Sequence, residues 1–312
     1  MSFESRTPYQ LFNSFILSKR RLGIMKLIAS DMDGTLLNEN GEISEANAKA
    51  VKEAINQGIE FIVATGRSYQ AANIPLQAAG ITCPVVSLNG AVTYQENEKI
   101  INSIPMDKSV AARIADECSK LGMYVELFTN KGVLSESREH FLEVLMDIMR
   151  TSNPDVSEQE MRETVEQRFQ LEQVVFVEQL QLALQDEHTE IYKILTFAFE
   201  EKQLEDAKKK LRDEPGAVIT SSGETNLEFN HPKAQKGLAI QKYIENEGWS
   251  MQDVMTIGDN WNDASMLEMA GRGVAMENAA DQIKNLCQYE TVSNEQDGVA
   301  KAIEDMLEEL DK

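Results

Sequence analysis

Short apolar runs separated by a helical pattern occupy the first part of the chain. The run that starts at Lys26 leads directly into Asp31, and similar runs follow at Ile59–Ala64 and Pro84–Leu88. Between the first two runs, the segment Ser44–Gln57 carries small apolar residues at helical spacing. Apolar runs bounded by turn residues are typical of buried strands, and strands that alternate with helices predict a parallel sheet.

A different texture begins at about Met106. Strands and helices no longer alternate there, and the region 151–173 is very polar and rich in Glu and Gln. The pattern predicts an α+β module inserted into the first domain. Its expected elements are helices at 108–121, 136–149 and 202–212, a strand at 191–199, and an antiparallel pair at 217–220 and 226–229.

From Gly237 the first pattern returns, with a helix to Glu247 and apolar runs at Asp253–Gly258 and Gly273–Met276. We therefore expect an α/β protein in which one parallel-sheet core is interrupted by a cap. Insertions of this kind are accommodated in surface loops. The expected organisation is an N-terminal extension at 1–24, a core at 25–105 and 224–312, and a cap at 106–223.

The charge balance limits the partners that the chain can have. Acidic residues number 52 and basic residues 30, which gives a net charge of -22 and argues against a nucleic-acid partner. No stretch approaches the roughly 18 uninterrupted apolar residues of a membrane span, so we expect no membrane partner. A small anionic substrate remains compatible, because salt screens exposed charges beyond about 8 to 10 Å.

The three cysteines and residues 1–24 indicate the cellular compartment of the protein. Cys83, Cys118 and Cys287 are far apart and lack metal-ligand spacing, which favours reduced thiols and a cytoplasmic protein. In residues 1–24 the basic cluster Lys19–Arg21 follows the apolar residues, the wrong order for a secretory signal. We expect this segment to be a disordered extension or the product of an upstream start codon, with a short membrane-surface anchor as the alternative.

Four polar clusters stand out in the sequence, three directly after expected strands and one directly ahead of a helix. Asp31 and Asp33 come two apart, so an extended chain would point both side chains the same way while Met32 offers its backbone N–H. Ligands of open α/β sheets bind just outside the carboxyl ends of the strands, so these clusters are expected to share one crevice. The other clusters are Thr65 with Gly66, Lys236 ahead of a helix, and Asp259-Asn-Trp-Asn-Asp263.

Taken in order, the motifs DMDGTL, ATGR, SLNGA, KG, GDNWND and GVAMENA resemble those of the haloacid dehalogenase superfamily. Their wording is similar to that of its Cof-type phosphatases with a type IIB (C2) cap, and the resemblance covers Met25 to the C-terminus. It implies a Rossmann-like core and Mg²⁺-dependent hydrolysis of phosphate monoesters.

The resemblance also implies roles for the acids. Asp31 would attack phosphorus and become an aspartyl phosphate, while Asp33 would protonate the leaving oxygen and then activate water. The Mg²⁺ ligands would be Asp31, the backbone carbonyl of Asp33, and Asp259, since Mg²⁺ prefers oxygen ligands. Asp263 is expected to orient Lys236 or a metal-bound water rather than to bind the metal directly.

The same resemblance implies which donors hold the phosphoryl group. They are the Lys236 ammonium, the Thr65 hydroxyl, the Asn262 amide, and the N–H groups of Gly66 and Met32. Lys233 competes with Lys236 for the role of the cation. Arg67 is left out of the site as a solvated or ion-paired residue, and Asn89 is equally compatible with a substrate contact and with a turn.

The expected substrate is a small phosphorylated metabolite, such as a sugar phosphate or a flavin-pathway phosphate like 5-amino-6-(5-phosphoribitylamino)uracil. Its identity would be set by the cap, which closes over the crevice. Alternatives are a sugar phosphomutase or phosphotransferase of the same structural group, and a receiver-like phospho-signalling module. We expect a monomer or a homodimer.

Overall fold

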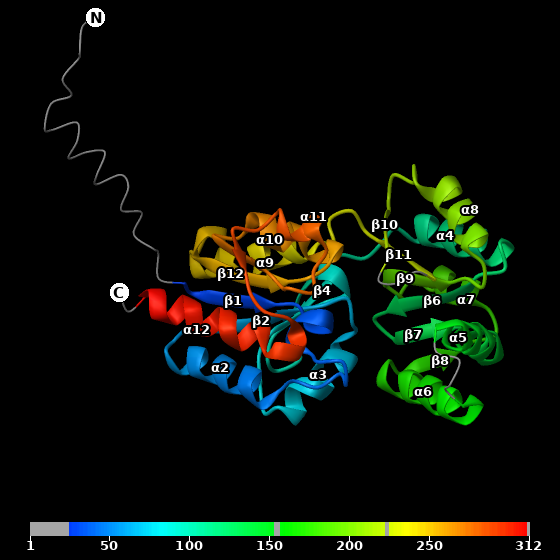
Figure 1. Ribbon diagram of the computed structural model, residues 1–312. Helices are drawn as coiled ribbons and strands as arrows, with labels where there is room; N and C mark the ends of the chain where they lie inside the picture. Colours follow the sequence, from blue (N-terminus) through cyan, green and yellow to red (C-terminus); the bar gives the residue numbers. More distant parts are fainter. Residues whose placement is uncertain (1–24, 153–156, 222–224, 311–312) are drawn as a thin grey trace, which may run out of the picture.

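The structure, a computed structural model, describes residues 25–152, 157–221 and 225–310. The expected extension 1–24 lies outside these residues. In the described ranges, one sheet has the order β14-β13-β12-β1-β2-β3-β4-β5 (Figure 1). The strands from β14 to β3 are parallel, and β4 and β5 continue antiparallel. Their bounds are β1 Leu27–Ser30, β2 Glu60–Ala64, β3 Val85–Ser87, β4 Val92–Tyr94, β5 Ile100–Ser103, β12 Val254–Gly258, β13 Arg272–Ala275 and β14 Tyr289–Glu290.

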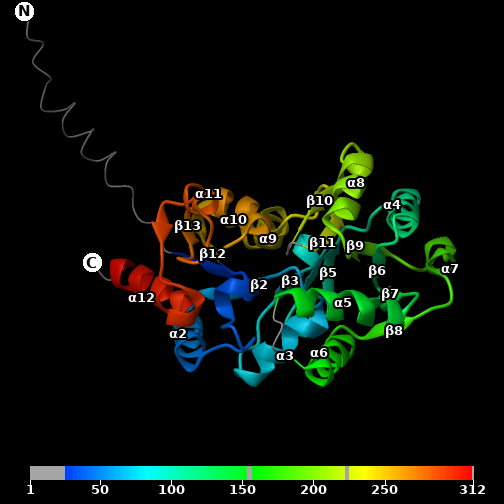
Figure 2. The same ribbon diagram turned by 45° about the vertical axis from the view of Figure 1, so that its right-hand side comes forward.

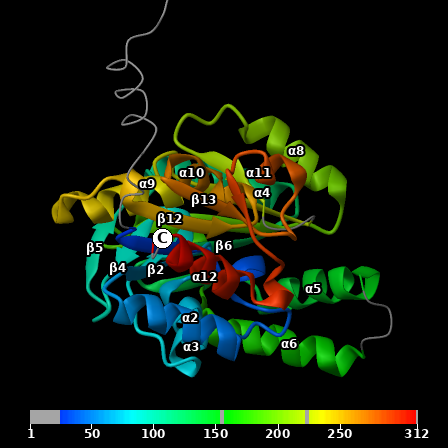
Figure 3. The ribbon, with the colours of Figure 1, turned by 60° about the vertical axis from the view of Figure 1, so that its left-hand side comes forward.

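Helices cover both faces of this sheet, as Figure 3 shows. One apolar cluster joins α2, α3 and α12 to the sheet, and a second joins α9, α10 and α11 to the opposite face. Strands buried on both faces are apolar throughout, which explains the runs in the sequence. These helices are α2 Glu45–Asn56, α3 Tyr69–Ala78, α9 Lys236–Ile244, α10 Ala264–Met269, α11 Asp281–Lys284 and α12 Gly298–Leu310.

Helix α2 illustrates how closely the local pattern determines an element. The hydroxyl oxygen of Ser44 accepts a hydrogen bond from the N–H of Asn47 at 3.1 Å, as an N-cap residue does. Ala50, Val51 and Ala54 are buried on the face that meets the sheet. The predicted helix and the predicted α/β fold class are confirmed.

The inserted segment forms a second sheet, of order β10-β11-β9-β6-β7-β8. All of its pairings are antiparallel except that of β7 with β8. Its strands are β6 Tyr124–Thr129, β7 Gly132–Ser135, β8 Val174–Phe176, β9 Ile191–Phe197, β10 Val218–Thr220 and β11 Asn226–Asn230. Its helices are α4 Lys108–Lys120, α5 Arg138–Ser152, α6 Glu158–Leu171, α7 Leu180–Gln185 and α8 Glu201–Leu211.

The two faces of the cap sheet differ in what covers them. The outer face packs against α4, α7 and α8, which Figure 2 shows on the side away from the core. On the other face, Phe128 of β6 and Tyr192 of β9 pack with core residues Leu88 and Val92. The cap sheet therefore faces the carboxyl ends of the core strands.

Two details of the cap add to what the sequence pattern predicted. The polar region after residue 150 contains the helix α6, whose buried Met161, Val165 and Phe169 recur every four residues among charged ones. The expected boundary between 223 and 224 falls inside the predicted antiparallel pair, which exists as β10 and β11. Because β11 also pairs with β9, a boundary after Asn230 would keep the cap sheet intact.

None of the helices in the described ranges combines the length and the apolar composition that a membrane span requires.

Candidate active site

The first and the fourth polar clusters meet because β1 and β12 are neighbours in the sheet. The N–H of Asp31 donates to the carbonyl of Ile257 at 3.0 Å, so the chain leaves β1 beside the end of β12. Gly34 follows with φ +74°, and a Cβ there would stand 2.5 Å from a carboxylate oxygen of Asp259. A glycine is thus required for the turn after β1 to approach Asp259.

Lys236 lies between two of the predicted acids. Its Nζ donates to Oδ1 of Asp31 at 2.5 Å and to Oδ1 of Asp263 at 2.6 Å, and its side chain is completely buried. Gly237 lets α9 approach α10, since a Cβ there would stand 2.5 Å from the carbonyl oxygen of Ser265. Lys233, the competing lysine, is exposed.

The remaining contacts of Asp259 and Asp263 fix the turn after β12. The hydroxyl of Thr35 donates to Oδ1 of Asp259 at 2.9 Å. Oδ2 of Asp263 accepts from the N–H groups of Asp259 and Asn260, both at 3.0 Å. Both oxygens of Asp263 therefore have partners within the protein, one on Lys236 and one on the turn.

Asp31, Asp259 and Asp263 repel one another in a largely buried cluster. Burial, followed by the nearby Asp263, raises the pKa of Asp31 well above its usual range, although Lys236 opposes this. Burial and Asp263 likewise raise the pKa of Asp259 to about 6. One lysine cannot balance three carboxylates, so a cation would relieve the repulsion among them.

The donor set is suited to a hard cation. Asp31, Asp259 and Asp263 each offer a carboxylate oxygen, and these atoms lie within 4.8 Å of one another. All three donors are oxygens, the ligands that Mg²⁺ and Ca²⁺ prefer. The residues present therefore fit a divalent cation.

Asp33 lies apart from this cluster. Its side chain is 58% exposed and forms an ion pair with Arg67, a residue that the sequence pattern had not assigned to the site. The expectation of two acids on one extended strand fails locally, since β1 ends at Ser30 and a tight turn, Met32–Leu36, follows. Both Asp31 and Asp33 nevertheless line the same cleft.

Two of the five predicted phosphate ligands line this cleft, and the other three are buried beneath it or next to residues that line it. Gly66 and Asn262 line it. Thr65 is buried, and its hydroxyl oxygen accepts from the N–H of Arg67 at 3.1 Å. Met32 directly follows Asp31, and its side chain is buried.

The cleft has a volume of about 400 Å³ and lies between the core and the cap. Arg168 lines the cleft and donates to both oxygens of the buried Glu126, at 2.7 and 2.6 Å. Lys193 of β9 reaches the core, where its Nζ donates to the carbonyl oxygen of Gly66 at 2.9 Å. The cap residues that line it are Phe128, Arg168, Glu172, Lys193, Leu195, Phe197, Asn226 and Glu228.

None of these cap residues was predicted from the sequence as part of the site. A signal was present, because Glu126, Lys193 and Glu228 are charged residues with apolar or aromatic neighbours on both sides in their strands. A charge in such a position is rarely buried unless it has a partner.

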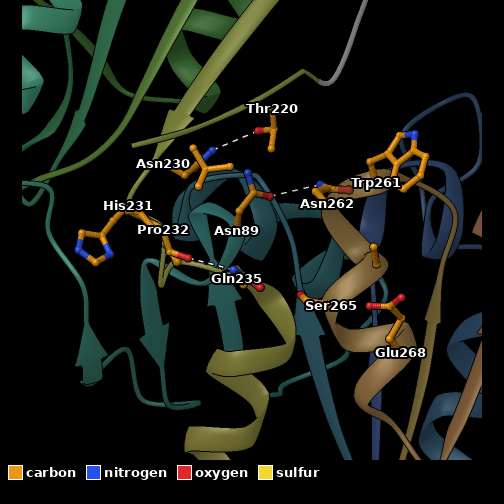
Figure 4. Close-up of a pocket in the computed structure, with 13 residues that line it drawn as sticks. Asn89, Thr220, Asn230, His231, Pro232, Gln235, Trp261, Asn262, Ser265 and Glu268 are labelled. Carbon is orange, nitrogen blue, oxygen red and sulfur yellow. Dashed lines mark hydrogen bonds between the residues drawn. The ribbon is translucent and has the colours of Figure 1, made fainter. Parts of the chain in front are cut away.

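A second, smaller pocket of about 290 Å³ lies beside the cleft, under the linker that joins β11 to α9 (Figure 4). Asn89 and Asn262 line it, and the amide Nδ2 of Asn262 donates to Oδ1 of Asn89 at 3.2 Å. Asn89, which the sequence left undecided, is thus in contact with a predicted phosphate ligand.

Comparisons with known proteins show which family the chain belongs to. A family model for haloacid dehalogenase-like hydrolases matches residues 28–303. Phosphatase YwpJ of Bacillus subtilis (strain 168) is 32% identical over 285 residues, which are 91% of this chain and 100% of that protein. The 5-amino-6-(5-phospho-D-ribitylamino)uracil phosphatase YwtE of the same organism is 32% identical over 287 residues, 91% of this chain and 98% of that protein.

A solved haloacid dehalogenase-like hydrolase from B. subtilis has a TM-score of 0.79 and 31% identity, covering 90% of this chain and 99% of that one. The chain belongs to the haloacid dehalogenase-like hydrolases, and within them to the Cof-type phosphatases. It is therefore a phosphoric monoester hydrolase, as the order of its motifs predicted.

Proposed function

We propose that the chain hydrolyses a small phosphorylated metabolite with the help of Mg²⁺ and through a phosphorylated Asp31. The observation that carries this proposal is the contact of Asp31 with Lys236 inside a cluster of three carboxylates at the edge of the cleft. A nucleophilic carboxylate next to a buried cation can approach a phosphate dianion that would otherwise repel it.

Two carboxylates divide the covalent chemistry. Asp31 forms a bond to phosphorus while the bond to the leaving oxygen breaks, and Asp33 gives that oxygen its proton. In the second step, water attacks phosphorus and loses its proton to Asp33, and the Asp31 carboxylate is released. The exposed position of Asp33 in the cleft suits a residue that exchanges protons with solvent and leaving group.

The transferring group spreads negative charge over three oxygens, which need donors. We assign this role to the N–H groups of Met32 and Gly66, the hydroxyl of Thr65, the Lys236 ammonium and the Asn262 amide. Asp263 holds Lys236 in place through its Oδ1.

Asp31, Asp259 and the backbone carbonyl of Asp33 would hold the Mg²⁺. The ion would neutralise charge on the phosphate and on the carboxylates. The raised pKa values of Asp31 and Asp259 support the need for added positive charge at this place. Asp263 is engaged by Lys236 and the turn after β12, which supports its assignment as a positioning residue.

For the substrate, we propose a phosphorylated flavin-pathway intermediate such as 5-amino-6-(5-phosphoribitylamino)uracil, with a sugar phosphate as the alternative. Support comes from the activity for which the relative YwtE is named and from the aromatic and polar side chains of the cap. Phe197 lines the cleft and is only partly buried, so its ring can contact a heterocycle, and the charged residues beside it offer partners for hydroxyl and amide groups.

The test is a phosphate-release screen over phosphorylated metabolites, run with Mg²⁺ and with a chelator. We expect turnover only with the metal, and none for Asp31→Asn. Turnover by Asp31→Asn would contradict the assigned nucleophile, and isomerised sugar phosphate without free phosphate would favour a mutase. The oligomeric state, monomer or homodimer, and the cytoplasmic location stay predictions.

A further inference from the structure

The loop after β3 contacts two of the segments that form the active site. The N–H of Leu88 donates to the carbonyl of Arg67 at 3.0 Å, and that of Asn89 to the carbonyl of Thr65 at 2.9 Å. A Cβ on Gly90 would stand 2.6 Å from the carbonyl oxygen of Gln235, directly before Lys236. The loop is therefore fitted against both segments, and each of them carries proposed phosphate donors.

The backbone of this loop is held in an uncommon conformation. Leu88 has φ +52°, and Asn89 has φ +57° and ψ +25°, in the left-handed region. Asn tolerates this region better than most residues, but Leu does not. Such conformations persist only where surrounding contacts over-determine them, and they often mark functional sites.

The side chain of Asn89 uses both ends of its amide. Its Oδ1 accepts from Nδ2 of Asn262 at 3.2 Å, and its Nδ2 donates to Oε2 of Glu228 at 2.9 Å. Asn89 is only 5% exposed and Glu228 only 7%. Glu228 belongs to β11 of the cap, whereas Asn89 and Asn262 belong to the core, so the amide bridges the two domains.

Glu228 of the cap determines the direction of both hydrogen bonds that Asn89 makes. A carboxylate only accepts, so Glu228 fixes Nδ2 of Asn89 toward the cap and Oδ1 toward Asn262. Asn262 must then turn its NH₂ group toward Asn89, and its second N–H remains for another acceptor. Within the described residues, the Oδ1 atom of Asn262 is buried without a hydrogen-bond partner. No donor therefore fixes the Asn262 amide from its oxygen end, and the contact with Asn89 is what orients it.

We propose that Asn89 is a positioning residue that couples docking of the cap to phosphate binding. Glu228 orients Asn89, and Asn89 orients the donor end of Asn262 toward the phosphoryl group. This inference rests on the proposed role of Asn262 in phosphate binding. When the cap moves away, Asn89 loses the contact that fixes its amide, and the phosphate site loses an oriented donor.

A double-variant test separates this coupling from a general effect on folding. In Asn89→Asp the side-chain shape is retained, but a carboxylate now faces Glu228, and repulsion between the two would move the acceptor away from Asn262. We expect the dissociation constant of inorganic phosphate for the Mg²⁺-loaded protein to rise about tenfold, the effect of losing one hydrogen bond to a charged group. KM for a phosphate ester should rise with it.

The rescue comes from Glu228→Gln in the same chain. The amide of the new side chain can donate to the carboxylate introduced by Asn89→Asp, and the total charge equals that of the original pair. We expect phosphate affinity of the double variant to return to within about threefold of the original, since the hydrogen bond is restored with reversed direction. Glu190→Gln is the matched control, because Glu190 is a cap residue that accepts from Tyr192. It should change neither phosphate affinity nor KM.

If the double variant binds phosphate no better than Asn89→Asp, or if Asn89→Asp binds it like the original protein, the coupling is overturned. Should Asn89→Asp fail to fold, Glu228→Ala tests the same contact without touching the left-handed residue, and unchanged phosphate affinity would overturn the proposal. Phosphate binding is measured calorimetrically and needs no turnover, so it stays informative even if Asp31→Asn disproves the proposed nucleophile.

Discussion

Arg67 donates to both oxygens of Asp33, from Nε to Oδ2 at 2.9 Å and from Nη2 to Oδ1 at 2.5 Å. A two-point contact fixes the plane of the carboxylate as well as its position. Asp33 is the proposed proton carrier, and its side chain is otherwise more than half exposed. Arg67 is therefore the group that limits where this carboxylate can go.

The first prediction follows from this contact. Arg67→Lys keeps the charge but loses the planar two-point contact, so we expect kcat to fall about tenfold. Asp33→Asn should cost about a hundredfold or more, the usual contribution of a general acid. Both losses should be larger for an alkyl phosphate than for p-nitrophenyl phosphate, whose leaving group needs no proton. Equal losses on the two esters would show that Arg67 acts elsewhere.

The acidic cluster predicts that Mg²⁺ stabilises the fold. Ligand at a hundredfold excess over its Kd adds about 2.7 kcal/mol to the free energy of unfolding. For a chain of this size we expect the Tm to rise by about 5 °C. Asp259→Asn should remove most of this shift, while Asp305→Asn, which removes a surface partner of Lys301 on α12, should retain it. An equal Mg²⁺ shift in both variants would contradict the proposed metal ligands.

The cysteines allow a prediction about pH. Burial raises the pKa of Cys83 and of Cys118 to about 12, whereas an unfolded thiol titrates near 8.5. At pH 8 their thiolate fraction is lower by about a thousandfold, so an alkylating reagent should label them only after unfolding. The contribution of these thiols to stability is present below about pH 8.5 and is lost as pH rises toward 12. Rapid labelling of either thiol in the native protein would contradict their burial.

The sequence predicted that Asp31 and Asp259 would lie close together, and this part of the prediction rests on local determinants. Asp31 follows an apolar strand and precedes a Gly-Thr turn, and Asp259 has the same relation to its own strand. A parallel sheet brings such strand ends together whatever the rest of the chain does. For that reason the residue pattern alone is sufficient to predict that these acids meet at this edge of the sheet.

The choices that remained open in the sequence depended on distant contacts. Lys233 and Lys236 differ locally by little more than a following glycine, and only the burial of Lys236 between two acids distinguishes them. Arg67 and Asn89 acquire their importance from partners in other segments, Asp33 and Glu228. Periodicity describes which side of an element a residue occupies, and it contains no information on which distant partner it meets.

The last prediction concerns the contact that joins the cap to the loop after β2. Lys193 is only 3% exposed; its Nζ donates to the carbonyl oxygen of Gly66 at 2.9 Å and lies 4.3 Å from the centre of the Phe128 ring. Lys193→Met keeps most of the side-chain volume and removes the donor. We expect the cap to dock less tightly, with KM rising about tenfold, the effect of one charge-assisted hydrogen bond.

Two measurements distinguish loosened docking from loss of folding. Proteolysis at the linker after β11 should become faster in Lys193→Met, while the Tm should change little, because each domain retains its own apolar core. Lys131→Met is the matched control, since Lys131 pairs with Asp186 on the surface of the cap. If both variants resist protease and bind substrate like the original protein, Lys193 does not hold the cap, and the contact with Gly66 has no part in docking.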